Sequence, residues 1–297
     1  MHNICCIGHI THDKVVTPGS VVHMPGGTSF YFSNAIRQMD TRYQLVTAVA
    51  APELPYVTAL QNVGIEVTAF PSQQTVFFEN IYSQDQDNRT QRVLHKSDPF
   101  TIDQLKEVRA EIFHLGPLLA DDIPVSLIRD LASRGKVSLD VQGYLREVRA
   151  ENVYPVDWLD KKEALPFISI LKANETEMEK LTGTSDIQDG IQKLTTWGVA
   201  EVIITLGSKG SVIYRDGATC IIPAYIPEQV IDATGCGDTY MAGYLYRRTK
   251  GDSIKDAGHF AAAMATRKIE GSGPFEGTEK DVQDVLQQRA TKLFMFR

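Results

Sequence analysis

Residues 232–243 read Asp-Ala-Thr-Gly-Cys-Gly-Asp-Thr-Tyr-Met-Ala-Gly, and this stretch is the most informative part of the chain. Gly235 and Gly237 flank a small residue, Asp238 follows, and a helix is predicted from there to a stop near Gly251. Glycines at a helix start leave backbone N–H groups free to converge on an anion, which the helix dipole also favours. A carboxylate at that place repels phosphate, so Asp238 is better explained as a base for a group that attacks phosphate. The pattern indicates phosphoryl transfer to a hydroxyl, although Gly-x-Gly-Asp also occurs in ordinary turns and helix caps.

The glycine spacing excludes two other nucleotide-binding motifs. A dinucleotide fingerprint, Gly-x-Gly-x-x-Gly, needs glycine at position 240, where this chain has Tyr240. A P-loop ends in Gly-Lys-Ser/Thr, and the run Gly-Ser-Lys-Gly-Ser at 207–211 does not provide it. A Rossmann-type oxidoreductase is therefore disfavoured.

The composition describes a globular protein with an acidic surface. The chain has 297 residues, of which 43% are hydrophobic and 23% charged, which suits one large domain. A formal net charge of −7 argues against nucleic acid as a partner. We find no signal peptide or long apolar run, so we expect a cytoplasmic protein with no membrane partner. None of the 4 cysteines forms a Cys-x-x-Cys pair, so neither a zinc site nor a disulfide framework is indicated.

Uniformly apolar strands alternate with helical stretches along most of the chain. They are predicted at 4–8, 44–50, 112–115, 137–140, 167–171 and 202–206, with a helix at 28–39. Such strands are typical of a sheet buried on both faces. The sequence predicts a doubly wound, mostly parallel α/β sheet in a single domain over residues 1–297.

Two β-rich segments, 14–24 and 75–95, interrupt this alternation. The second reads as a hairpin with a polar turn at 84–88. Both are predicted to form a small β-sheet lid on the main sheet. Ligands of open α/β sheets bind beyond the carboxyl ends of strands, and Asp13, Asp140, Asn174 and Gly207 are predicted at such ends.

Four short motifs follow one another along the chain: Gly26-Gly27, Asn174-x-x-Glu177, Thr-Leu-Gly-Ser-Lys-Gly-Ser at 205–211 and the 232–243 stretch, in which Cys236 stands where alanine is commoner. With these motifs in this order, the chain resembles the ribokinase-like (PfkB) carbohydrate kinases. The resemblance covers essentially the whole chain. The resemblance implies an ATP-dependent kinase that phosphorylates a hydroxyl of a small sugar or polyol.

The family implies a catalytic and donor-binding role for several of these residues. Asp238 would accept the proton of the attacking hydroxyl, and the backbone amides of Gly235, Cys236 and Gly237 would form an anion hole. Glu177 would hold Mg²⁺ through water. Residues bordering the nucleotide would be Asn174, Thr205, Gly207, Gly210, His259 and Ala262. The alternatives are a solvated helix start around Glu177, a plain hairpin turn at 205–211 and a packing role for His259.

The same resemblance extends to a monovalent cation. Asp232, Thr234 and the loop at 270–273 are similar to the family's K⁺ site beside the anion hole. The alternative for Asp232 is a cap on its own turn.

On the substrate side, Asp13, Gly26 and Gly27 would bind substrate hydroxyls. The chain departs from the ribokinases at Tyr31, where they have asparagine, so their sugar contacts do not carry over. Leu-Asp-Val-Gln-Gly-Tyr-Leu-Arg at 139–146 is nearer the inositol-kinase-type branch, which implies substrate contacts for Asp140 and Gln142, unless they only pack at a strand end.

The lid would exclude water, and its free edge suggests a homodimer formed through the lid. Two other functions remain open. One is a nucleoside kinase of the same fold, with Phe30, Tyr31 or Phe77 stacking on the base. The other is a catalytically idle sensor of sugar or nucleotide, against which the retained Asp238 and Glu177 argue.

Overall fold

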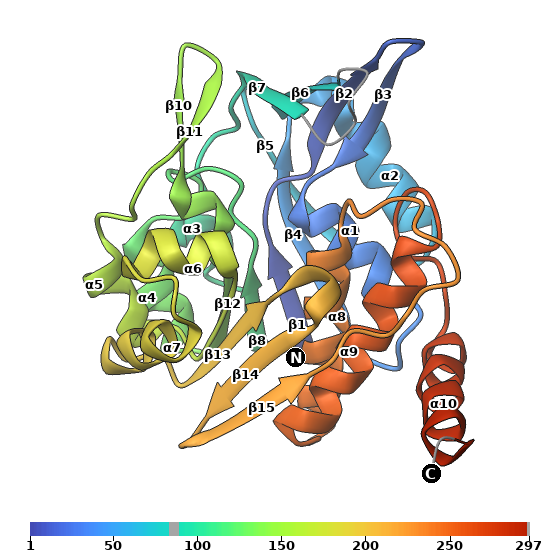
Figure 1. Ribbon diagram of the computed structural model, residues 1–297. Coiled ribbons are helices and arrows are strands. Elements are labelled where there is room, and N and C mark those ends of the chain that lie inside the picture. The colour runs from blue at the N-terminus through green and yellow to red at the C-terminus, as the bar shows by residue number, and fades with distance from the viewer. Residues whose placement is uncertain (83–88, 296–297) are drawn as a thin grey trace.

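The computed structural model describes residues 1–82 and 89–295, whose strands form two sheets (Figure 1). The larger sheet has nine strands in the order β15-β14-β13-β12-β9-β8-β1-β4-β5. Its strands are β1 (His2–Ile7), β4 (Tyr43–Val49), β5 (Glu66–Pro71), β8 (Ala110–Leu115), β9 (Lys136–Asp140), β12 (Ile170–Asn174), β13 (Glu201–Thr205), β14 (Ser211–Arg215) and β15 (Ala218–Ile222). All pairs are parallel except β13–β14 and β14–β15. The predicted doubly wound, mostly parallel sheet is confirmed.

Helices cover both faces of this sheet (Figure 1). They are α1 (Thr28–Ile36), α2 (Leu54–Asn62), α3 (Ile102–Leu105), α4 (Val125–Ala132), α5 (Lys161–Ala164), α6 (Glu175–Thr182), α7 (Ile187–Thr196), α8 (Cys236–Thr249), α9 (Ile254–Ile269) and α10 (Glu279–Met295). Among residues 1–82 and 89–295, no helix combines the length and hydropathy of a bilayer-spanning segment.

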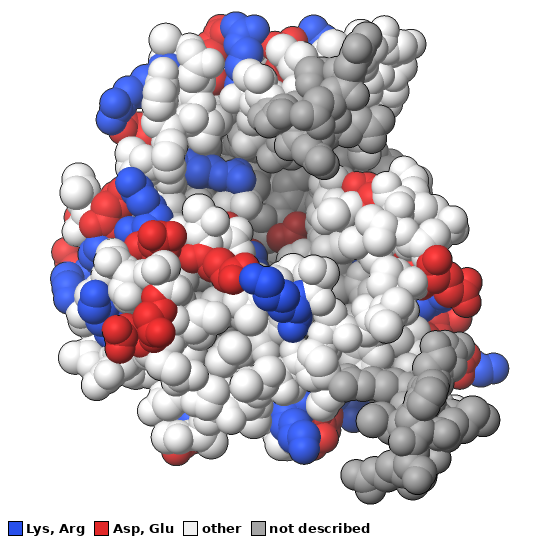
Figure 2. Space-filling model, in the orientation of Figure 1, with Lys and Arg blue, Asp and Glu red and all other residues white. Residues whose placement is uncertain are grey.

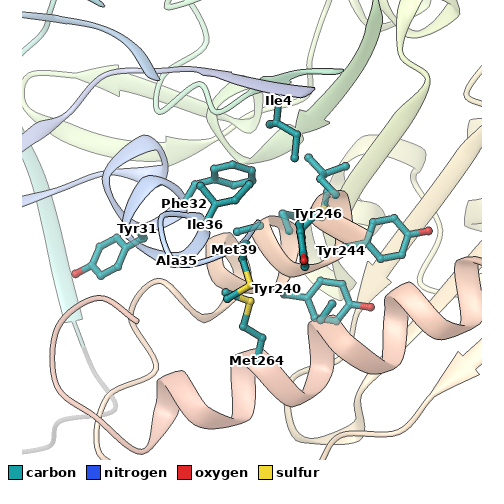
Figure 3. Close-up of a cluster of buried hydrophobic side chains, with 14 of the residues drawn as sticks. Ile4, Tyr31, Phe32, Ala35, Ile36, Met39, Tyr240, Tyr244, Tyr246 and Met264 are labelled. Atoms are coloured by element: carbon teal, nitrogen blue, oxygen red, sulfur yellow. The ribbon is translucent and has the colours of Figure 1, made fainter. Parts of the chain in front are cut away.

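The apolar strands supply two cores at once because successive side chains point to opposite faces. In β1, Ile4 and Cys6 face a core with α1, α8 and α9, while Cys5 and Ile7 face a core with α4, α6 and α7. In the first core, Phe32 and Ile36 of α1 and the following Met39 belong to the same cluster as the tyrosines of α8 and Met264 of α9, and Met39 lies next to Met264 (Figure 3). This packing holds the N-terminal ends of α1 and α8 side by side.

The second sheet has six strands in the order β10-β11-β7-β6-β2-β3 and forms the predicted lid. Its strands are β2 (Thr11–Thr17), β3 (Ser20–Gly26), β6 (Val76–Tyr82), β7 (Arg89–His95), β10 (Arg146–Arg149) and β11 (Asn152–Pro155). The first predicted lid segment, 14–24, is longer than expected, since it runs from Thr11 to Gly26. The prediction of two segments was wrong, since residues 146–155 add a third. The predicted turn at 84–88 lies outside the described residues.

Most predicted strand boundaries lie within two residues of the observed ones, and the larger differences have local causes. The strand expected at 167–171 runs from Ile170 to Asn174, because a 3-10 turn with Pro166 occupies 165–167. The helix expected at 28–39 ends at Ile36. Asp13 lies within β2 rather than after the first strand. The helix α8 ends at Thr249, and Gly251 has φ of 88°, as its predicted role as a stop requires.

Candidate active site

A cleft of about 1610 Å³ lies between the lid and the carboxyl ends of the large sheet's strands. Figure 2 shows the molecule hollowed between its upper and lower parts. Predicted site residues that line it are Asp13, Gly27, Asp140, Gln142, Asn174, Glu177, Thr205, Gly207, Gly210, Asp232, Thr234, Gly235, Cys236, Gly237, Asp238 and Ala262. Of the predicted set, Gly26 and His259 do not line it. The fold therefore brings the separate motifs to one place.

The turn before α8 has the conformation that its glycines permit. Gly235 has φ of 77°, and a Cβ there would lie 2.2 Å from Cδ1 of Tyr31, so no other residue fits beside that ring. The N–H of Cys236 donates to Ala233 O at 3.2 Å and is committed to the turn. The amides of Gly237 and Asp238 lie in the first helical turn, where a helix supplies no partner. An anion at the start of α8 would therefore meet the amides of Gly237 and Asp238, and not that of Cys236, which the sequence prediction included.

Asp238 sits among charged groups that change its acidity. Burial raises the pKa of this carboxyl to about 7, and the neighbouring Asp140 and Glu177 act in the same direction. The ammonium of Lys172 and a hydrogen bond from Thr28 oppose the rise. A carboxyl poised near neutral pH is suited to accept a proton.

Lys172 is a site residue that sequence reasoning missed. Its Nζ lies 2.8 Å from Asp140 Oδ2 and 4.0 Å from Glu177 Oε2, and its side chain is 7% exposed. It is also 3.3 Å from where a Cβ on Gly237 would lie. One buried ammonium thus joins the predicted substrate side, metal side and anion hole. The available signal was a lysine in an apolar strand, which needs a partner to be buried.

Asn174 and Glu177 form a reciprocal cap at the start of α6. Each backbone N–H donates to the other's side chain at 2.8 Å. Glu177 is buried, not solvated, and its Oε1 accepts a hydrogen bond from Gln142 Nε2 at 3.3 Å. In the described part of the chain no three His, Cys, Asp or Glu side chains gather as a metal site. The Glu177 carboxylate lines the cleft beside the Asn174 cap, where it would hold a water of an Mg²⁺ that arrives on phosphates.

The far end of the cleft has an apolar slot beside the loop at 207–210. That loop joins β13 to β14 as a tight turn, with φ of 56° at Gly207 and 99° at Gly210. The slot is lined by Tyr225, Ile226, Val230, Ile231, Ala262 and Ala265. His259 does not line the cleft; its Nδ1 lies 3.1 Å from the Tyr225 hydroxyl, in keeping with the packing role given above as the alternative, and its contact with the nucleotide stays a prediction.

The lid end of the cleft is polar. Asp13 Oδ1 accepts from Thr11 Oγ1 at 2.6 Å, and Gln91 donates to Asn80 at 2.9 Å. A Cβ on Gly26 would lie 2.3 Å from Asp13 Oδ2, so this glycine makes room for the carboxylate instead of lining the cleft. Arg146 also reaches the cleft. The sequence prediction missed Asn80, Gln91 and Arg146 because the lid pairing brings them there from separate segments.

Of the aromatic residues considered for base stacking, only Tyr31 lines the cleft, together with Phe78, which was not considered. Phe77 is the neighbour of Phe78 in β6, so its side chain points to the opposite face of the lid, where it meets His12.

Asp232 binds a lysine of this chain. Lys268 Nζ donates to Asp232 O at 2.8 Å, to Asp232 Oδ2 at 3.2 Å and to Gly271 O at 3.4 Å. Burial alone would raise the pKa of Asp232, but hydrogen bonds from Thr234 and the Lys268 ammonium hold it below its usual value. The oxygens expected to surround K⁺ therefore already hold a cation, and the site does not fit a free ion.

The fold and this cleft define a kinase of the PfkB class. Residues 81–281 match the model of the pfkB family carbohydrate kinases, and the chain belongs to that family. It is similar to a cytidine kinase of Thermococcus kodakarensis, with 27% identity over 268 residues, which are 86% of this chain and 92% of the relative. A ribokinase of Arabidopsis thaliana is 33% identical over 195 residues, 62% of this chain and 48% of the relative.

Among solved structures, a pyrophosphate-dependent kinase of the ribokinase family, complexed with a pyrophosphate analog and myo-inositol, has a TM-score of 0.83 at 26% identity. The match covers 95% of this chain and 99% of the other. This neighbour supports the resemblance to the inositol-kinase-type branch. The chain is a phosphotransferase with a hydroxyl acceptor.

Proposed function

We propose that this protein is a single-domain ATP-dependent kinase for a small polyhydroxylated molecule, a cyclic polyol or sugar. The observation that carries the proposal is the position of Asp238. It stands at the start of α8 beside the free helix amides, in a cleft whose other wall is the polar lid. A substrate hydroxyl bound next to Asp238 would have a base for its proton and, beside it, amides to bind the phosphoryl group that it attacks.

The mechanism follows from the groups in the cleft. Asp13, Asp140 and Gln142 would bind hydroxyls of the acceptor, because carboxylate and amide oxygens accept from them. Asp238 would take the proton of the attacking hydroxyl, and the amides of Gly237 and Asp238 would stabilise charge on the phosphoryl group. Mg²⁺ would neutralise charge on the donor phosphates, with Glu177 fixing one of its waters.

The apolar slot supports a nucleoside triphosphate as the donor. Ile226, Val230 and Ala262 offer apolar surface to an aromatic base, and Thr205 and Gly207 line the same cleft. Pyrophosphate has no part that would use such surface, although the structural neighbour named above depends on it. We expect phosphorylation of the acceptor with Mg-ATP and a far lower rate with Mg-pyrophosphate at equal concentration.

The acceptor is tested by a panel of inositols, pentoses, hexoses and nucleosides assayed for ADP release. We expect turnover with a polyol or sugar. A nucleoside acceptor is the second candidate. The apolar side chains of Tyr31, Phe78 and Met24 also line the cleft and could contact a base, and one relative is a cytidine kinase. If no acceptor gives ADP above background, the kinase proposal fails and a binding function takes its place.

The pH dependence of the reaction should report Asp238. Since the pKa of this carboxyl is raised to about 7, it is protonated and inactive as a base in acid. The kcat/KM measured between pH 5 and 9 should rise about tenfold per pH unit below about 7 and level off above it. A flat profile across this range would remove Asp238 as the base.

The lid also suggests a homodimer. Its strand β3 exposes Val21 and Val22, which are 56% and 48% accessible, and it is an edge strand of the lid among residues 1–82 and 89–295. We propose that two copies pair through this edge. Sedimentation equilibrium should give a dimer for the wild type, and Val22→Lys should shift it towards monomer; a monomeric wild type at micromolar concentration would contradict this.

A further inference from the structure

The ammonium of Lys268 is enclosed by oxygen atoms of this chain. Its three donors meet Asp232 O, Asp232 Oδ2 and Gly271 O, at 2.8, 3.2 and 3.4 Å. The side chain has 0% exposure. An ammonium has three N–H groups and no acceptor, so these contacts satisfy it completely. Complete enclosure is what makes a fully buried charge tolerable.

The lysine ties together two loops that the fold brings to the start of α8. Asp232 also accepts from Thr234 N at 2.9 Å and from Gly273 N at 3.2 Å. The backbone N–H groups of residues 231 and 232 donate to Ile269 O. The turn at 232–235, which leads into the anion-binding amides, is thereby fixed to the end of α9 through Lys268 and its oxygens.

An ammonium group and a potassium ion share the property that matters in a cage of oxygen atoms. Each is a monovalent cation that carbonyl and carboxylate oxygens can surround in place of water. The difference is that Lys268 is covalently attached and cannot dissociate. We propose that the Lys268 ammonium replaces a dissociable monovalent cation, so that this kinase needs no K⁺ for activity. The proposal rests on the kinase function proposed above.

The wild type gives the first test. Its kcat/KM should be the same, within about twofold, in potassium chloride and in tetramethylammonium chloride at equal ionic strength, because the organic cation is too large for an oxygen cage. Activation by K⁺ of several-fold or more would overturn the proposal. This arm needs no variant and so does not depend on the folding of one.

Lys268→Ala gives the second test, because it empties the cage while leaving the oxygens in place. In tetramethylammonium chloride we expect its kcat/KM to fall roughly 10- to 100-fold, and in potassium chloride to recover most of the loss. Lys250→Ala is the matched control, since Lys250 lies at the C-terminal end of α8, is 39% exposed, and contacts Asp40 and the Tyr246 ring instead of the oxygens around Lys268. It should be unaffected by the choice of cation.

Thermal unfolding supplies a readout that does not depend on the acceptor or on catalysis. A cation bound only by the folded state raises Tm, so Lys268→Ala should melt a few degrees higher in potassium than in tetramethylammonium chloride, while the wild type and Lys250→Ala show no difference. A folded Lys268→Ala without a K⁺-specific rise in Tm would overturn the proposal. If Lys268→Ala does not fold, Lys268→Ser is measured in its place with the same criteria. A failed kinase assay leaves this measurement intact, so the two proposals can fail separately.

Discussion

Asp238→Asn should abolish most of the phosphoryl transfer while making the folded protein more stable at alkaline pH. Loss of a general base costs roughly 10²- to 10⁴-fold in kcat. Because burial raises the pKa of this carboxyl to about 7, its ionised form opposes folding above that pH. The neutral amide removes that opposition, so Tm at pH 8 should rise by a few degrees.

The difference in Tm between the wild type and Asp238→Asn should depend on pH. The folded pKa lies above the ordinary value of 3.8, so the protonated form is favoured by folding, and its contribution to stability declines as pH rises from about 4 through about 7. Wild type and Asp238→Asn should therefore have similar Tm values near pH 4 and diverge above it. The measurements are kcat with Mg-ATP at pH 8 and Tm by circular dichroism at pH 4 and pH 8.

Asp186→Asn is the matched control for this substitution. Asp186 accepts from Asp189 N at the start of α7, and asparagine caps helices equally well. It should leave both kcat and Tm unchanged. Wild-type kcat in Asp238→Asn would exclude Asp238 from the reaction, whatever the effect on stability.

The parts of the site that were predictable from the sequence are those in which chemistry and local structure coincide. The glycines at 235 and 237, the Asn174–Glu177 cap and the strand-end Asp140 each lie at a helix or strand terminus, which short patterns reveal. The uniformly apolar strands predicted the buried sheet for the same reason.

The missed parts depend on contacts between distant segments or on unusual backbone. The hairpin of β10 and β11 turns at Ala150 and Glu151, with φ of 47° and 69°, so it lacks the glycine or asparagine that marks such turns. Lys268 reaches Asp232 across 36 positions of sequence. Its role is visible only when the end of α9 is placed beside the turn before α8.

Lys172→Met should lower kcat on the order of 10²- to 10³-fold, because it removes a buried ammonium that lies beside Gly237 and next to the anion-binding amides. It should also move the pH profile to higher pH, since Lys172 lowers the pKa of Asp238. A residue that only supported the fold would change Tm without moving this profile. The measurement is kcat/KM with Mg-ATP between pH 5 and 9.

The control for Lys172→Met separates loss of charge from loss of folding. Removing one partner of a buried ion pair costs about 3–5 kcal/mol, because Asp140 is left buried and unpaired. The double variant Lys172→Met/Asp140→Asn removes that carboxylate charge and should recover much of the lost Tm, yet it should stay inactive, since neither the ammonium nor the acceptor-binding carboxylate is restored. Recovery of activity in the double variant would show that Lys172 serves only to neutralise Asp140. A Lys172→Met protein with wild-type kcat and an unmoved pH profile would exclude the ammonium from the reaction altogether.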